Sequence, residues 1–146
     1  MRSTVITQGV TVTARCAECD GVLMLDIGQF VERGRLCWGT EGYCLSCPVA
    51  WCDQDSGDVT PEEIRRALLT QHGPARLRLT DPEARMVPVL RALREVYGLS
   101  LPRARVLANE LRATGLVGTF VEMELLASRL RHLAVGVTVD MESPTE

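Results

Sequence analysis

Two pairs of cysteines are the residues of this 146-residue chain whose types and spacing point most directly to chemistry. Cys16 and Cys19 form one Cys-x-x-Cys pair, Cys44 and Cys47 form the other, and 24 residues separate the pairs. Each pair presents two thiolates from one tight turn, and two such turns supply the four sulfur ligands of a closed, tetrahedral zinc site. The spacing therefore predicts a structural Zn²⁺ ion held by these four cysteines. Four thiolates leave no coordination position for a catalytic water.

The two other cysteines and the two histidines do not indicate a catalytic site. Cys37 lies in the apolar stretch 36–38, where a small buried side chain is expected, whereas Cys52 is either a substitute ligand or a free thiol. A redox pair of the thioredoxin type is the alternative for a Cys-x-x-Cys motif, but no βαβ pattern surrounds either pair. His72 and His132 have no serine, cysteine or acidic partner at a suggestive spacing. We therefore expect a protein that is not an enzyme.

Composition and charge narrow the class of protein further. Apolar residues make up 46% and charged residues 24% of the chain, as in folded globular proteins. No apolar run approaches the roughly 18 residues of a membrane helix, and the N-terminus does not resemble a secretory signal, so we expect a soluble cytoplasmic protein with reduced thiols. Residues 1–73 hold six Arg against ten Asp and Glu, and residues 74–146 hold ten against nine. This acidic N-terminal half disfavours nucleic acid as a partner.

The elements that must position the cysteines are predicted to be short strands joined by turns. They form a zinc ribbon over residues 1–58, followed by a linking helix within 59–74. Thr60 is expected to cap this helix, with Glu63 closing a capping box, and the helix should end at Gly73. A segment of this size buries too little apolar surface to fold alone, whereas metal binding contributes on the order of 10 kcal/mol. Without zinc the ribbon should unfold.

Longer elements are predicted in the C-terminal half, which we expect to form a second domain over 75–142 with a disordered tail at 143–146. The expected elements are a strand at 76–80, a helix at 86–97, a helix at 101–112 capped by Ser100, a strand at 116–120, a helix at 121–133 and a strand at 135–141. The predicted fold class is α+β, with the three helices on one face of a three-stranded antiparallel sheet.

Residues 87–107, VPVLRALREVYGLSLPRARVL, resemble the C-terminal domain of the bacterial large-subunit ribosomal stalk protein. The most specific part is Gly98-Leu99-Ser100-Leu101 followed by Ala104-Arg105, and the resemblance extends over about 76–141. It implies a domain that recruits translational GTPases through its first two helices. The positions that match the recruiting surface are Val87, Leu90, Arg91, Arg94 and Arg105. Five Arg against two acidic residues over 86–112 fit a surface that docks an acidic partner.

The expected function is thus a non-enzymatic, zinc-binding protein-interaction module that binds a translational GTPase or another component of the translation machinery. Three alternatives stay open. The Arg residues could form an ordinary solvated face, and the ribbon could bind nucleic acid or act in regulation. The same fold is also similar to that of the adaptor of the Clp protease, which leaves a proteolytic-adaptor-like protein as the third.

Overall fold

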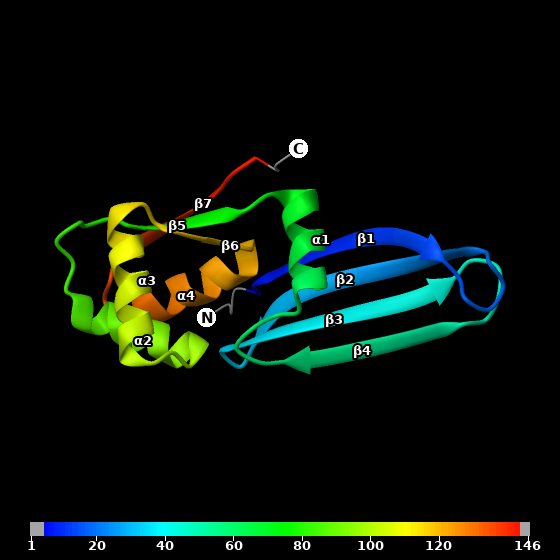
Figure 1. The fold of residues 1–146 in the computed structure, drawn as a ribbon, viewed down its shortest axis with the longest axis horizontal. Coiled ribbons are helices and arrows are strands. Elements are labelled where there is room, and N and C mark those ends of the chain that lie inside the picture. The colour runs from blue at the N-terminus through cyan, green and yellow to red at the C-terminus, as the bar shows by residue number, and fades with distance from the viewer. Residues whose placement is uncertain (1–4, 144–146) are drawn as a thin grey trace.

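The computed structural model describes residues 5–143 and contains four helices and two antiparallel sheets, one of four strands and one of three. The predicted fold class, α+β, is confirmed. The four-stranded sheet occupies one end of an elongated molecule, and the three-stranded sheet lies with three of the helices at the other end (Figure 1). The tail predicted over 143–146 lies, apart from Ser143, outside the described residues.

The N-terminal sheet is a meander in which each strand pairs with the next one along the chain. Its strands are β1 (Thr7–Arg15), β2 (Val22–Glu32), β3 (Arg35–Cys44) and β4 (Ala50–Ser56). They are longer than the short strands we expected, since β2 alone has 11 residues and spans about 35 Å. This length places both cysteine loops at one end of the sheet and the β2–β3 hairpin turn at the other (Figure 1).

The β2–β3 turn consists of Arg33 and Gly34, which have φ angles of 53° and 73°. Two successive positive φ angles are typical of the type I′ hairpin turn, whose twist matches that of the strands. The turn fixes the register in which Gly28 of β2 lies opposite Gly39 of β3.

Trp51 packs on Gly42 through a close contact that depends on the absence of a side chain there. Gly42 of β3 pairs directly with Trp51 of β4, and a Cβ atom added to Gly42 would lie 2.4 Å from carbon atoms of the indole ring. The ring therefore lies across bare backbone, and Gly42 is buried.

Replacing Gly42 by alanine is expected to destabilise the protein by roughly 1–3 kcal/mol, because the indole or the strand must shift to admit the methyl group. Thermal unfolding checks this, with Gly28→Ala as the matched control. A Cβ atom on Gly28 would meet only the Gln8 carbonyl oxygen, at 3.7 Å. Equal melting temperatures for the two variants would contradict the close contact described here.

The C-terminal half packs its helices on the second sheet. Its elements are β5 (Ala75–Leu79), α2 (Met86–Tyr97), α3 (Leu101–Ala113), β6 (Leu116–Gly118), α4 (Phe120–His132) and β7 (Val137–Met141), with β5 between β6 and β7. Leu77 of β5 is fully buried and shares one hydrophobic cluster with Leu93 of α2, Leu111 of α3 and Leu126 of α4. The neighbour that follows it in the strand, Arg78, is exposed, so one face of β5 meets the helices and the other meets solvent.

Helix capping agrees with prediction in one place and differs in another. Ser100 caps α3 by accepting a hydrogen bond from the Arg103 amide, as predicted. The prediction that Thr60 caps the first helix is wrong. This helix, α1 (Glu62–His72), begins after Pro61 without a side-chain cap, because the hydroxyl of buried Thr60 accepts a hydrogen bond from Gln29 of β2 instead.

A second hydrophobic cluster joins the N-terminal meander to α4. Leu36 and Trp38 of β3 are buried against Val121 and Leu125 of α4. Helix α1 also contacts β1 and β2, and the Nε2 atom of His72 lies 2.7 Å from the Gly9 carbonyl oxygen. The two halves are thus packed on each other near the hairpin-turn end of the meander. The domain boundaries at residues 58 and 74 stay a prediction.

Candidate metal centre and docking groove

Two loops at the far end of the meander place the paired cysteines. In the β1–β2 loop the Cys16 amide donates to the Gly21 carbonyl at 2.9 Å, and the Asp20 amide donates to the Cys16 carbonyl at 2.9 Å. In the β3–β4 loop the Cys44 amide donates to the Val49 carbonyl at 3.0 Å. These bonds tighten each loop around its Cys-x-x-Cys pair, so that both thiols of a pair point to the same side.

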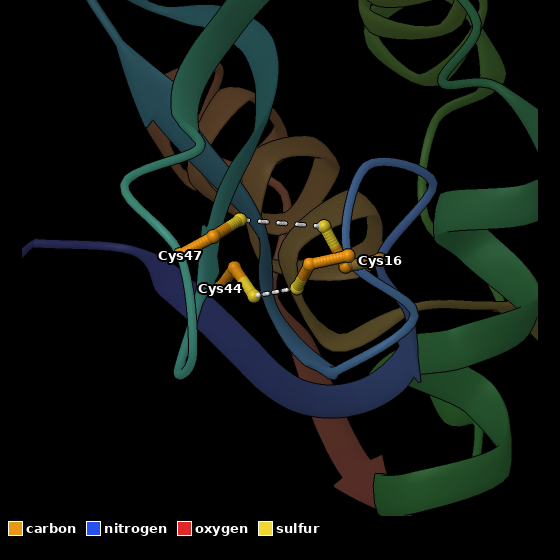
Figure 2. A group of neighbouring side chains, drawn as sticks. Cys16, Cys44 and Cys47 are labelled. Atoms are coloured by element: carbon orange, nitrogen blue, oxygen red, sulfur yellow. Dashed lines mark hydrogen bonds between the residues drawn. The ribbon is translucent and has the colours of Figure 1, made fainter.

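The four thiols meet between these loops, as predicted. Their sulfur atoms all lie within 4.8 Å of one another, with 3.8 Å between Cys16 and Cys47 and 3.4 Å between Cys19 and Cys44. Figure 2 shows Cys44 and Cys47 of one loop facing the thiols of the other. Zinc–sulfur bonds of about 2.3 Å in a tetrahedron put the sulfurs about 3.8 Å apart, so the cluster is positioned to hold a metal ion. All four cysteines are free of disulfides.

Gly21 is required where the two loops approach. A Cβ atom added to it would lie 2.8 Å from the Ser46 hydroxyl oxygen and 3.1 Å from the Cys19 sulfur. A side chain at this position would have to displace the side chains of Ser46 and Cys19, one of the four thiols.

Backbone amides stabilise negative charge on the cluster. The Ser46 amide donates to the Cys44 sulfur at 3.3 Å, and this bond lowers the pKa of Cys44 to about 6. The Gly21 amide acts in the same sense on Cys19, but hydrogen bonds with the thiols of Cys44 and Cys47 outweigh it and raise the pKa of Cys19 to about 12. A bound metal ion must displace the protons that its thiol ligands carry.

The two other cysteines and the histidines lie outside the cluster. Cys37 is buried in β3 and its thiol donates to the Arg35 carbonyl, which fits the small buried role predicted for it. Cys52 is exposed in β4 and belongs to no group of metal ligands within residues 5–143. His132 is exposed at the end of α4.

The structure also brings together the five residues predicted to bind a partner. They lie on α2 and α3 along a groove of about 740 Å³, whose lining is Val87, Leu90, Arg91, Arg94, Glu95, Gly98, Leu99, Leu101 and Arg105. The groove combines apolar side chains, among them the strongly exposed Val87, with three guanidinium groups. Such a surface suits a partner segment that is apolar on one side and acidic on the other.

Glu95 is a groove residue that sequence reasoning did not single out. Its carboxylate pairs with Arg91 at 2.9 Å and with Arg129 of α4 at 3.3 Å, and the Arg91 hydrogen bond lowers the pKa of Glu95. Arg94 donates to the Leu99 carbonyl at 3.3 Å and so supports the α2–α3 turn. Arg105 is exposed and makes no ion pair with another of the described residues.

A buried polar network centred on Glu122 was also missed. Glu122 accepts hydrogen bonds from Arg65 at 2.7 and 3.1 Å, from Gln29 at 3.3 Å and from the Thr119 amide at 3.0 Å. Gln29 bonds Thr60 at 2.8 Å and accepts a bond from the Thr119 hydroxyl. The pattern Thr119-x-x-Glu122, which forms a capping box at the start of α4, was the available signal.

None of the described helices combines the length and the apolar character needed to cross a membrane. In comparisons with family models, with curated proteins and with solved structures, nothing matches this chain.

Proposed function

We propose that the protein is a non-enzymatic, cytoplasmic interaction module in which a structural zinc ion rigidifies one end and the α2–α3 groove binds an acidic protein partner. The observation that carries the proposal is the meeting of Val87, Leu90, Arg91, Arg94 and Arg105 along a single groove. These residues come from two helices, and neighbouring positions on one helix would not by themselves produce a concave surface.

Zinc is the metal that best suits the cluster. Four thiolates in tetrahedral arrangement favour zinc or an iron–sulfur centre over harder ions such as magnesium or calcium. The sulfur separations support a single ion, and sulfur atoms on all sides of it leave no place for a reacting water. The site is therefore proposed to stabilise the fold and to perform no catalysis.

The class of partner follows from the charge of the groove together with the stalk resemblance of residues 76–141. The resemblance implies a translational GTPase or another component of the translation machinery. The groove supports an acidic, partly apolar docking segment, because three Arg side chains line it against the single carboxylate of Glu95, which already pairs with Arg91. A proteolytic adaptor would also bind protein segments, but nothing in the groove favours that role.

The variant Arg105→Glu reverses the charge of one groove residue. It is expected to bind a purified translational GTPase about tenfold more weakly, because one desolvated contact of about 1.4 kcal/mol is lost. Arg103→Glu is the matched control: it lies on the same helix and is exposed, but it does not line the groove. Side chains two positions apart on a helix point about 200° away from each other, so that Arg105 faces the groove and Arg103 does not. Isothermal titration at constant salt measures the effect.

Equal affinities for the two variants, or no binding by the unmodified protein, would contradict the groove as the docking site. A gel shift with RNA at two salt concentrations tests the nucleic-acid alternative separately. Phosphate binding must weaken steeply as salt rises.

A further inference from the structure

Strand β4 leaves one side of the meander open. It pairs with β3 and with no other strand of the described chain, so its outer side forms an edge of the four-stranded sheet (Figure 1). All 7 residues of the strand are exposed. An edge of this length without proline, lysine or a bulge is a ready template for another strand.

The hydrogen-bonding direction of each β4 residue follows from the bonds at its two ends. The carbonyl of Val49 accepts from Cys44, and the amide of Gly57 donates to Leu36 of β3. In an antiparallel pair the bonding direction alternates from residue to residue. The backbone amide and carbonyl groups of odd-numbered residues therefore point toward β3. Those of even-numbered residues, among them the amides of Cys52 and Gln54, point outward. The next outward amide, that of Ser56, is already bonded to the Asp55 carboxylate at 2.8 Å.

The chain segment that holds this edge is acidic, and the nearest Arg residues, Arg35 and Arg129, lie beyond its end beside Gly57 and Asp58. Residues 36–64 contain six Asp and Glu and no Arg or Lys. Asp53 and Asp55 lie two positions apart in β4, and so they share one face of the sheet with Trp51. Pairing of β4 with the β4 of a second copy would bring these carboxylates together, and like charges on facing strands are destabilising. The edge therefore disfavours self-association and favours a positively charged strand.

We propose that the outer edge of β4 is a second docking site, distinct from the α2–α3 groove, that binds an extended basic segment of another protein by strand addition. Backbone bonds from Cys52 and Gln54 hold the segment. Two Lys or Arg residues, two positions apart, face Asp53 and Asp55, and an apolar residue faces Trp51. The protein would thus hold a basic segment at one end and an acidic one at the other.

The test uses the full chain with its metal and a short fluorescent Val-Lys peptide, at a concentration where the free peptide is monomeric. Every second residue of the peptide is Val, and the residues between them are Lys, Lys and Leu, so that one face carries two Lys and one apolar residue. Two control peptides separate strand pairing from simple attraction: one has Glu in place of Lys, and one keeps every Lys but has Pro in place of Val. Anisotropy measures affinity, and amide hydrogen exchange reports on Cys52 and Gln54. The Val-Lys peptide should bind at least tenfold more tightly than either control and should slow exchange at both amides.

Two protein variants complete the test. Gln54→Pro removes an outward amide without removing a β3–β4 bond, since proline is tolerated on the open side of an edge strand. Asp53→Asn with Asp55→Asn removes the charge and keeps the shape. Each should weaken binding at least tenfold, whereas Glu83→Gln with Asp140→Asn, which removes the same charge elsewhere, should not.

Tight binding of the proline-containing peptide would overturn the proposal, because it would show attraction without strand pairing. Unchanged affinity in the Asn double variant would do the same, and that variant keeps the test valid if Gln54→Pro fails to fold. Protection of Cys52 and Gln54 in the protein without peptide, together with a dimer in sedimentation, would show that a second copy occupies the edge.

Discussion

Removal of the metal is expected to unravel the far end of the β1–β4 meander while the core formed by α2, α3, α4 and β5 stays folded. The far end has few buried side chains of its own, chiefly those of Cys16 and Leu23. Metal binding to four thiolates contributes on the order of 10 kcal/mol, which is more than this small apolar contact can replace. The turn end of the meander, in contrast, is packed against α4 through Leu36 and Trp38.

Cys16→Ser tests this most directly, because Cys16 is the most deeply buried of the four ligands at 2% exposure. Native mass spectrometry should show one zinc ion per chain for the unmodified protein and none for this variant. Hydrogen exchange should lose protection at the loop ends of β1 to β4 and keep it at Leu77 and Leu126. Cys52→Ser is the control, since Cys52 lies outside the cluster and should leave zinc content unchanged. Full exchange protection after chelation would show that the metal does not hold this lobe.

The local features of the chain could be predicted because their causes are local. Helix α2 has the predicted limits 86 and 97, since Gly98 ends it in a left-handed conformation with φ of 63°. The cap of α3 by Ser100 follows from the same kind of short-range pattern. The thiol cluster could also be predicted, because each Cys-x-x-Cys turn orients its own two ligands.

The long strands and the Glu122 network could not be predicted for the opposite reason. A cysteine-rich segment with several glycines favours short strands, and nothing near Gly42 in sequence shows that Trp51 covers it. Gln29 and Thr119 are hydrogen-bonded although 90 residues separate them. Thr60 had a plausible local role as a helix cap, but the bond to Gln29 prevailed because a buried hydroxyl and a buried amide satisfy each other there.

The groove could be predicted only in part. Leu90, Arg91 and Arg94 are neighbours on one helix, which spacing alone predicts. Arg105 joins them only because α3 folds back on α2 after the Gly98 turn, so that its inclusion depended on the stalk resemblance. The same resemblance did not indicate how the meander packs on α4, since that contact involves residues of the first half of the chain.

Loss of the Glu122 carboxylate is expected to have the second large effect, because this group joins three parts of the structure. It bonds Arg65 of α1, Gln29 of β2 and the Thr119 amide at the start of α4. The Glu122 side chain is 9% exposed and that of Arg65 is 24% exposed, so neither partner recovers its full hydration when the other is removed. Breaking a buried pair of this kind costs roughly 3–5 kcal/mol.

Glu122→Ala should therefore lower the melting temperature by roughly 10–15 °C. Glu124→Ala is the matched control on the same helix, since Glu124 makes only a 3.8 Å pair with a half-exposed Arg131, worth at most about 1 kcal/mol. Hydrogen exchange of Glu122→Ala should show faster opening at both β2 and α1, because the two elements lose their common partner together. Faster exchange confined to the first turn of α4 would mean that Glu122 serves only as a helix cap, and the meander and the helices would then be held together by the remaining contacts, such as the apolar contact of β3 with α4 and the bond of His72 to Gly9.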